Sequence, residues 1–199
     1  SICNRRCEQE CTRGLLDAPL AIDEIKKFIA EKELNEEERY IPLCENEEGG
    51  FYPHKMAIIG AGPAGMSAAY YLRIKGYPVT IFEKEEKPGG MLRYGIPSFR
   101  LEKDVIDAEI EVLKAMGIEF RCGVEIGKDI TIDGLREEGY EAIYLAIGAQ
   151  GGKKLNIPGM NEEYVMTGVD FLREVNREES KDMLSGHVVV IGGGNVAMD

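Results

Sequence analysis

Two glycine-rich segments of this chain have the spacing that lets a backbone approach a phosphate group. The first, Gly60 to Gly65, reads Gly-Ala-Gly-Pro-Ala-Gly and follows a short apolar run. Its glycines permit, in turn, a tight turn, close approach to a pyrophosphate, and packing of the next helix on the strand. The N-terminus of that helix would offer unpaired N–H groups to the phosphates. We predict dinucleotide contacts from five residues of the loop, namely Gly60, Ala61, Gly62, Ala64 and Gly65.

An acidic residue further along the chain supports this prediction. Glu83 ends the next apolar run, 18 residues beyond Gly65. A carboxylate at this position can accept hydrogen bonds from both hydroxyls of a ribose and would repel a 2′-phosphate. We therefore expect FAD or NAD in the first loop rather than NADP. The alternative is a glycine turn followed by a surface glutamate, and the combined strand, loop, helix, strand and acid argue against it.

The second glycine segment follows the apolar run Val188 to Ile191 and reads Gly-Gly-Gly-Asn-Val-Ala. Alanine in the last position is the common variant in a second, nicotinamide-binding domain. We predict that this segment begins a second dinucleotide site through Gly192, Gly194, Asn195 and Ala197. The residues that would separate NADPH from NADH are expected beyond Asp199, so we expect the chain to be a piece of a longer enzyme. Two such loops in one chain indicate transfer of electrons between two dinucleotides.

Three of the five cysteines, Cys3, Cys7 and Cys11, are separated by three residues each. Thiolates at this spacing can converge on an iron–sulfur centre, which takes four cysteine ligands. Two other interpretations remain open from the spacing alone. One is a stripe of buried thiols on a helix face, against which the charged neighbours argue, and the other is a zinc site. Cys44 and Cys122 are expected to be structural thiols.

The composition is that of an ordinary globular protein, with 199 residues, 44% hydrophobic and 30% charged. A net charge of −12 argues against partners such as nucleic acid or an anionic lipid surface. No apolar run approaches the roughly 20 residues that span a bilayer. An odd, crowded set of cysteines favours a reducing cytoplasm over a disulfide framework. No catalytic set of side chains is recognisable, so we expect cofactors to carry the chemistry.

Strands and helices must alternate if these loops are to be positioned for binding. We expect strands at Met56 to Ile59, Val79 to Glu83, Glu119 to Cys122, Ala142 to Ala146 and His187 to Ile191. Helices are expected at Ala21 to Glu31, Ala64 to Lys75, Lys103 to Met116 and Val169 to Val175. This alternation predicts an α/β fold with a parallel sheet.

A long run after Glu83 is more distinctive than either glycine loop. Residues 89–101 read Gly-Gly-Met-Leu-Arg-Tyr-Gly-Ile-Pro-Ser-Phe-Arg-Leu. With residues 81–84 ahead of it, this run resembles the small (beta) subunit of NADPH-dependent glutamate synthase. That family includes related FAD/iron–sulfur oxidoreductases and the N-terminal part of dihydropyrimidine dehydrogenase. The resemblance implies a Rossmann-like FAD-binding domain of the two-dinucleotide-binding flavoprotein type, preceded by a small α-helical iron–sulfur segment.

The resemblance also implies roles for single residues. Glu83 would bind the FAD ribose, Gly90 and Leu92 would lie along the flavin, and Val124 would touch the adenine through its backbone. Gly148 lies in a segment that resembles the second flavin-side turn of the family. The second loop would bind the pyrophosphate of NADPH or NADH. For Arg93 and Arg100 two interpretations stay open, a solvated surface pair or a role near a cofactor or cluster.

The cysteine segment resembles the N-terminal [4Fe–4S] segment of the same family. Residues 3–14 and 18–22 carry this similarity. In the family another cysteine precedes at the same spacing, which here would fall before Ser1. We therefore expect that the 199 residues alone cannot hold a normally ligated cluster, because the fourth ligand is missing.

The implied organisation is an iron–sulfur segment over residues 1–50, the first part of an FAD domain over 54–165, and the start of an NAD(P)H domain over 166–199. The implied function is passage of hydride from NAD(P)H to FAD, with electrons leaving through clusters to a larger catalytic subunit, by resemblance that of glutamate synthase. The alternatives are a related subunit serving a hydrogenase, transhydrogenase or pyrimidine reductase, or a simple one-cofactor dehydrogenase. A protein that keeps only the fold is disfavoured by the intact first loop and its acid.

Overall fold

The computed structural model describes residues 2–45, 52–152, 157–159, 163–178 and 184–199. The chain divides into two compact units, Ser1–Ile41 and Pro42–Asp199, and each is described by itself. The predicted end of the N-terminal segment, at residue 50, lies outside the described residues.

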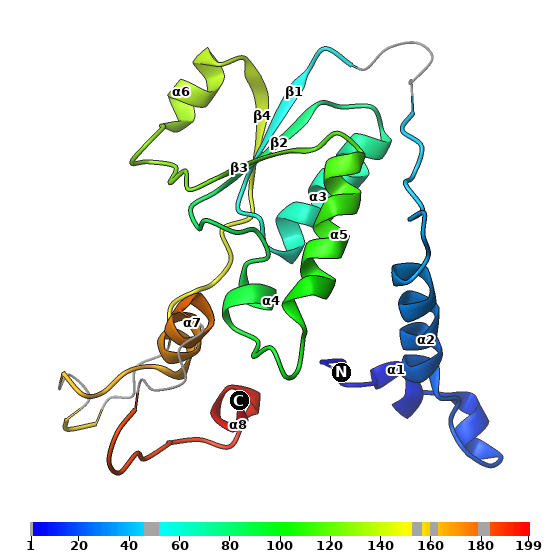
Figure 1. Ribbon diagram of the computed structural model, residues 1–199, viewed down its shortest axis with the longest axis vertical. Helices are drawn as coiled ribbons and strands as arrows, with labels where there is room; N and C mark the ends of the chain where they lie inside the picture. The colour runs from blue at the N-terminus through cyan, green and yellow to red at the C-terminus, as the bar shows by residue number, and fades with distance from the viewer. Residues whose placement is uncertain (1, 46–51, 153–156, 160–162, 179–183) are drawn as a thin grey trace. The chain divides into compact units, whose positions relative to one another are not determined.

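A four-stranded parallel sheet forms the centre of the larger unit, with strand order β3-β2-β1-β4 (Figure 1). Strand β1 pairs with β2 on one side and β4 on the other. The chain therefore reverses its direction of progress across the sheet at β1. In open α/β sheets the ligand crevice lies at the carboxyl ends of the strands at this point. The strands are β1 (Lys55–Ile59), β2 (Val79–Glu83), β3 (Glu119–Cys122) and β4 (Tyr140–Leu145), which confirms the predicted fold class.

Both faces of the sheet carry apolar side chains because successive residues of a strand point to opposite sides. On one face Ile58 and Ile81 pack with helices α3 (Pro63–Ile74) and α5 (Lys103–Ala115). On the other face a second cluster joins strand residues to Leu135 of α6 (Ile132–Glu137), and it contains Ala57, Ile59, Phe82, Leu135 and Tyr140. In Figure 1, α3 and α5 lie beside each other along the sheet. These two clusters hold the strand ends in fixed positions.

Strand β4 is an edge strand and is covered less well than the others. Its residues Tyr144 and Leu145 are 48% and 60% exposed. The predicted strand at Ala142 to Ala146 is confirmed, although pairing with β1 begins earlier, at Tyr140.

Shorter helices complete the larger unit. Helix α4 (Met91–Tyr94) follows the Gly89–Gly90 segment, α7 (Gly168–Glu178) packs against α4, and α8 (Asn195–Met198) follows the second glycine segment. The predicted helix at Val169 to Val175 is confirmed within α7. Among the described residues, none of the helices combines the length and the apolar character needed to cross a bilayer.

The expected strand at His187 to Ile191 is wrong. These residues have irregular backbone, and Val188 to Ile191 are between 52% and 83% exposed. An apolar, β-branched run favours a strand only where neighbouring strands can pair with it and cover its faces. No described strand pairs with this run.

The N-terminal unit consists of α1 (Arg6–Gln9), a 3₁₀ turn η1 (Thr12–Leu15) and α2 (Ile22–Leu34). The predicted helix at Ala21 to Glu31 is confirmed and extends three residues further. Its apolar residues Ile25, Phe28 and Ile29 are more than half exposed, and no described residue of this unit is buried. The unit therefore has no hydrophobic core of its own among the described residues.

Candidate dinucleotide-binding site

The first glycine loop lies where the carboxyl ends of three strands meet. The N–H of Gly60 donates to the carbonyl of Phe82 on β2 at 2.7 Å, and the N–H of Ala146 donates to the carbonyl of Ile59 at 2.8 Å. The loop therefore continues directly from β1, between the ends of β2 and β4. Helix α3 begins immediately afterwards, with Gly62 as its N-cap residue and Pro63 in its first turn. The first N–H groups of a helix lack an acceptor within the helix, which favours an anion at its N-terminus.

Two glycines of the loop are required by the packing. Gly60 has φ +106°, and a Cβ on it would overlap the carbonyl of Ala146. A Cβ on Gly65 would overlap the Gly60 carbonyl oxygen, with the Ile58 side chain 3.2 Å away. Gly60 thus allows the turn beside β4, and Gly65 lets α3 approach β1. These are the roles predicted for the first and third glycines.

Glu83 lies inside the site rather than on the surface and is only 6% exposed. Its Oε2 accepts a hydrogen bond from the N–H of Ala61 at 2.7 Å, and its Oε1 accepts one from the N–H of Glu85 at 3.0 Å. The carboxylate therefore fixes the glycine loop to the end of β2. Each carboxylate oxygen has a second lone pair, so both can still accept a ribose hydroxyl. The alternative of a surface glutamate is wrong.

The Gly89–Gly90 segment folds directly against the first loop. The N–H of Gly89 donates to the carbonyl of Ala61 at 2.9 Å. Gly90 has φ +54°, and a Cβ on it would lie 2.7 Å from the Cα of Gly62. Two glycines are therefore needed where these segments meet. The contact leaves this surface without side chains, so that a flat or extended ligand can approach the backbone.

Two cations hold the segment of residues 88–96 in place. Arg93 is 5% exposed, its Nε donates to the carbonyl of Pro88 at 2.7 Å, and its guanidinium pairs with Asp107 on α5. Lys103 donates from Nζ to the carbonyl of Ile96, and burial, followed by the charge of Arg93, lowers the pKa of this ammonium. Of the two interpretations for Arg93, a solvated surface residue is therefore wrong. Arg100 instead forms an ion pair with Asp199.

Four further residues that were predicted to contact a cofactor lie on or beside the segments that follow these strands. Leu92 lies on α4, and its N–H donates to the carbonyl of Gly89 at 3.2 Å. Val124 follows β3, and its N–H donates to the carbonyl of Glu83 at 2.9 Å. Gly148 follows β4 with φ +70° and has open space where a Cβ would be. Ala64 is exposed in the first turn of α3. Whether each contacts a cofactor stays a prediction.

Cys122 ends β3 and pairs with Glu83 at the end of β2. Burial is the main reason that the pKa of its thiol is raised, and the charge of Glu83 raises it further. The thiol therefore stays protonated around neutral pH. This agrees with the expected structural role.

The second glycine segment forms a turn and begins a helix, although no strand is found at the run before it in the described part of the chain. Gly194 is the N-cap residue of α8, and the N–H of Ala197 donates to its carbonyl at 3.0 Å. Gly192 has φ +134°, a conformation that favours glycine. Asn195 is the first residue of α8. The loop is exposed, and whether it contacts a phosphate stays a prediction.

The cysteine segment is tied to α2 by polar contacts. Arg5, with φ +53°, contacts Asp23 at 3.2 Å and Glu24 at 2.7 Å. Glu8 Oε1 accepts a hydrogen bond from the N–H of Asp23 at 2.8 Å, at the start of α2. These contacts fix the backbone between Cys3 and Cys7.

No disulfide joins the three thiols, and Cys3 Sγ accepts a hydrogen bond from the N–H of Arg5 at 3.4 Å. Cys3 and Cys7 are exposed and Cys11 is partly buried. Hydrogen bonds from the backbone of Leu20 and then Arg13 lower the pKa of the Cys11 thiol. Across residues 2–45 and the other described ranges, no group of three or more His, Cys, Asp or Glu side chains is arranged to hold a metal ion. The structure therefore does not itself assemble the predicted cluster site.

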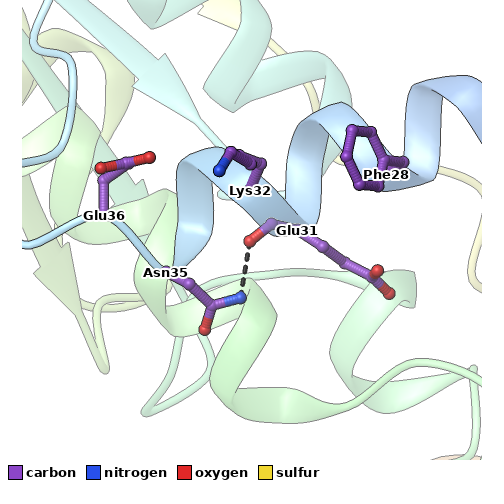
Figure 2. A pocket seen from close by; sticks show the side chains of 5 residues that line it. All are labelled: Phe28, Glu31, Lys32, Asn35 and Glu36. Carbon is purple, nitrogen blue, oxygen red and sulfur yellow. Dashed lines mark hydrogen bonds between the residues drawn. The ribbon is translucent and has the colours of Figure 1, made fainter.

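Two hollows in the described surface contain none of the predicted site residues. One, of about 280 Å³, runs along the end of α2 and is lined by Phe28, Glu31, Lys32, Asn35 and Glu36 (Figure 2). There the side-chain amide of Asn35 donates to the carbonyl of Glu31 at 2.6 Å, which ends the helix. The other, of about 300 Å³, lies between α3 and α5. The first glycine loop lies instead at the carboxyl ends of the strands, and the second is exposed.

Sequence comparison agrees with this geometry. The sequence pattern of the pyridine nucleotide-disulphide oxidoreductase family matches residues 54–199, which include both glycine loops. The chain belongs to this family. Members of a family share a fold and an ancestral chemistry, so the chain is part of an oxidoreductase.

Three curated relatives cover almost the whole chain of this pyridine nucleotide-disulphide oxidoreductase. The NADP(+)-dependent formate dehydrogenase subunit beta of Moorella thermoacetica is 40% identical over 100% of the chain and 31% of its own length. The NAD-dependent dihydropyrimidine dehydrogenase subunit PreT of Escherichia coli O157:H7 is 40% identical over 97% of this chain and 45% of its own length. The glutamate synthase [NADPH] small chain of Mycobacterium tuberculosis is 36% identical over 100% of this chain and 42% of its own length. The chain thus spans less than half the length of each relative.

A solved structure supports the fold. FprA of Mycobacterium tuberculosis in complex with NADPH matches with a TM-score of 0.56 and 27% identity. The match covers 63% of this chain and 29% of that one. The resemblance inferred from residues 81–101 and the fold class are confirmed by these comparisons.

Proposed function

We propose that the chain is part of an NAD(P)H-dependent flavoprotein, in which the first glycine loop holds FAD and the second holds the nicotinamide nucleotide. The observation that carries the proposal is the contact of Gly62 with Gly90 beside the buried carboxylate of Glu83. This arrangement provides a side-chain-free backbone surface, a helix N-terminus and a hydrogen-bond acceptor for a ribose. An ADP group with free ribose hydroxyls fits all three, while a 2′-phosphate would be repelled by Glu83.

The residues of the chain would bind and orient the cofactor. Backbone N–H groups at the start of α3 would neutralise the pyrophosphate, and Glu83 would orient the adenosine ribose. Gly90 and Leu92 would border the ring system, and the carbonyl of Val124 would accept a hydrogen bond from the adenine. When bound, FAD supplies a centre that accepts a hydride and releases single electrons. Gly192, Gly194, Asn195 and Ala197 would cradle the pyrophosphate of NADPH or NADH.

Electrons would then pass to a larger partner subunit through iron–sulfur clusters, with Cys3, Cys7 and Cys11 as ligands of one [4Fe–4S] cluster. The support for this cluster is the cysteine spacing, the absence of a disulfide at these three cysteines and the resemblance. The electron acceptor is proposed to be the glutamate synthase large subunit. Relatives named as formate dehydrogenase and dihydropyrimidine dehydrogenase subunits make a different partner the second candidate. A reducing, cytoplasmic setting fits five cysteines that form no disulfide in the described structure.

The decisive experiment is an anaerobic titration of the full-length protein with NADPH and, separately, NADH. We expect flavin absorbance that bleaches with at least one nucleotide. A protein without flavin absorbance would instead be the one-cofactor dehydrogenase. Flavin that neither nucleotide reduces would contradict the proposed reaction.

The variant Glu83→Gln tests the first site within the same experiment. An amide can accept only through its oxygen, so one of the N–H groups of Ala61 and Glu85 would lose its acceptor. A buried donor left without a partner costs about 1–3 kcal/mol, and we expect flavin content to fall accordingly. Glu86→Gln, at an exposed position three residues further on, is the matched control and should retain its flavin.

A further inference from the structure

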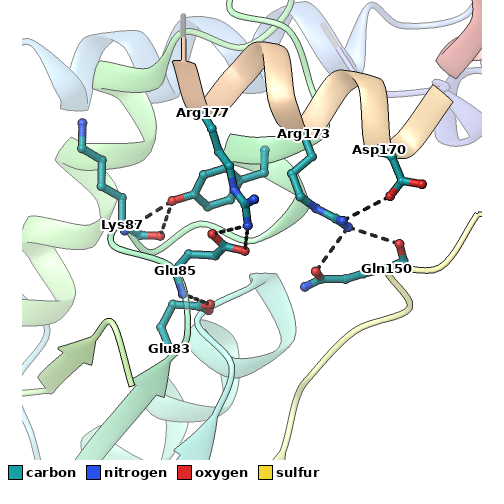
Figure 3. Close-up of polar contacts among 8 residues, drawn as sticks. Glu83, Glu85, Lys87, Gln150, Asp170, Arg173 and Arg177 are labelled. Carbon is teal, nitrogen blue, oxygen red and sulfur yellow. Dashed lines mark hydrogen bonds and ion pairs between the residues drawn. The ribbon is translucent and has the colours of Figure 1, made fainter. Parts of the chain in front are cut away.

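Helix α7 is anchored by polar contacts to two segments that leave the ends of the central strands (Figure 3). Arg177 Nη2 lies 2.5 and 2.7 Å from the two carboxylate oxygens of Glu85. One turn earlier, Arg173 Nη2 donates to the carbonyl and side-chain oxygens of Gln150, at 3.2 and 3.3 Å. Glu85 follows β2, and Gln150 follows β4. One helix therefore bridges both sides of the first glycine loop.

In the Arg177–Glu85 pair, the carboxylate side is shielded from water and the guanidinium side is not. The Glu85 side chain is 13% exposed, and that of Arg177 is 46% exposed. The guanidinium also lies 6.0 Å from the centre of the Tyr94 ring, within cation–π range. Its pKa is raised, mainly by the hydrogen bond to Glu85. Beside it, the amide of Asn176 donates to the carbonyl of Tyr94 at 3.3 Å.

Glu85 is itself fixed to the predicted ribose acid. Its N–H donates to Glu83 Oε1 at 3.0 Å, and its carbonyl accepts from the N–H of Gly123 at 3.0 Å. A continuous set of contacts therefore runs from Arg177 through Glu85 to Glu83, and from there to the first glycine loop. These contacts connect α7 to the backbone of that loop.

At its other end, α7 contacts the second glycine segment. A Cβ on Gly168, the first residue of α7, would lie 2.8 Å from the Cγ1 of Val196 on α8. Asp199, which follows α8, forms an ion pair with Arg100, which lies in the run of residues 89–101. The helix thus connects the two loops that are proposed to bind the two dinucleotides.

We propose that Arg177 and Glu85 are a positioning pair, which holds the second dinucleotide loop in the orientation that transfer to the first requires. This rests on the proposed function, in which a hydride leaves the reduced nicotinamide, oxidising it, and reduces the flavin. Neither residue contacts the reacting atoms. Their effect is on the alignment of two bound groups, and the rate of such a transfer is sensitive to displacements of about 1 Å.

The test uses the full-length protein and a charge exchange. Arg177→Glu and Glu85→Arg each place like charges together, and the double variant restores an opposite-charge pair. We expect each single variant to slow flavin reduction at saturating nucleotide by about ten- to hundredfold. The double variant should recover most of the loss, since residues in direct contact are energetically coupled. Flavin content and nucleotide affinity should stay close to wild type, which separates positioning from binding.

Matched controls make the result decisive. Arg136→Glu disrupts an exposed pair with Asp133 on α6 and should leave the rate unchanged. If the charge reversals lose flavin or fail to fold, Arg177→Met keeps the aliphatic stem and should slow reduction with flavin retained. A wild-type rate in Arg177→Met or in both single reversals, or a folded double variant without recovery, would overturn the proposal. Failure of the proposed function is distinct, because the wild-type protein itself would then show no reduction by either nucleotide.

Discussion

Ala61 makes clear how tightly single residues define the first site. Its N–H donates to Glu83 and its carbonyl accepts from Gly89, so both of its backbone polar groups are used. The backbone of Ala61 is therefore held by Glu83 of β2 on one side and by Gly89 on the other. Such a loop needs little rearrangement on binding, and preorganisation of this kind lowers the free-energy cost of binding.

The variant Gly90→Ala should destabilise this arrangement. Its φ of +54° disfavours any residue with a Cβ, and the new methyl group would lie 2.7 Å from Gly62. Backbone strain and overpacking together should lower the free energy of unfolding by about 2–4 kcal/mol. Urea unfolding of the 199-residue chain measures this. Gly151→Ala is the control, because nothing lies within 4 Å of its added Cβ, and equal midpoints for both variants would contradict the observed contact.

At this scale, the sequence predicted the residues whose identity is dictated by the backbone. Gly60, Gly65 and Glu83 lie where their spacing indicated, because each role follows from local sterics or from the end of a strand. Glu85 and Arg177 were missed. Both belong to charged stretches that have the composition of a solvated surface, and only the tertiary fold brings together residues so far apart in sequence.

Among the elements, the strands are tied together by side chains as well as by backbone pairing. The hydroxyl of Tyr140 on β4 donates to the Thr80 hydroxyl on β2 at 3.0 Å. That hydroxyl in turn donates to Glu119 on β3 at 3.0 Å. This chain of hydrogen bonds spans the sheet and links its two edge strands. It helps to hold β4 beside β1.

Removing the hydroxyl of Tyr140 should weaken the sheet. In Tyr140→Phe, Thr80 loses a buried donor, while the edge-to-face contact of ring 140 with Phe82 is retained. We expect the free energy of unfolding to fall by about 1 kcal/mol, as for a typical buried hydrogen bond. Tyr144→Phe, four residues along the same strand and half exposed, is the control, with an expected change near zero. Equal effects of the two changes would show that this bond does not stabilise the sheet.

The central elements were predictable because buried parallel strands have short apolar sequences separated by helices. The expected strand Val79 to Glu83 has the bounds observed for β2. The short helices α4 and α6 were not predicted, since one or two turns leave almost no periodic pattern. The strand expected at His187 to Ile191 failed for the opposite reason, because its pattern is strong but pairing depends on neighbours.

Over the whole molecule, the two units differ in how they can be stabilised. The larger unit has two apolar clusters, whereas residues 2–41 contain no buried residue. A unit of about 40 residues usually needs a metal, a disulfide or a partner to stay folded. The proposed cluster would supply such a constraint.

This contrast gives a test of the cluster in the full-length protein. Cys7→Ser should lower the iron content, and it should also speed hydrogen exchange of the amides of α2. Helix α5 has the same length, 13 residues, but buries three of them, and its exchange should not change. Hydrogen-exchange mass spectrometry together with iron and sulfide assays measures both. An unchanged iron content would contradict the assignment of Cys7 as a ligand.

The uncovered edge of β4 has a consequence for how this chain behaves in solution. An edge strand with exposed Tyr144 and Leu145, together with the exposed run at Val188 to Ile191, can pair with the same segments of another copy. A net charge of −12 opposes such self-association by mutual repulsion. That repulsion is screened by salt, whereas apolar attraction is not. Colloidal stability should therefore decrease as ionic strength rises, and dilute, low-salt buffer is the condition that keeps the chain dispersed.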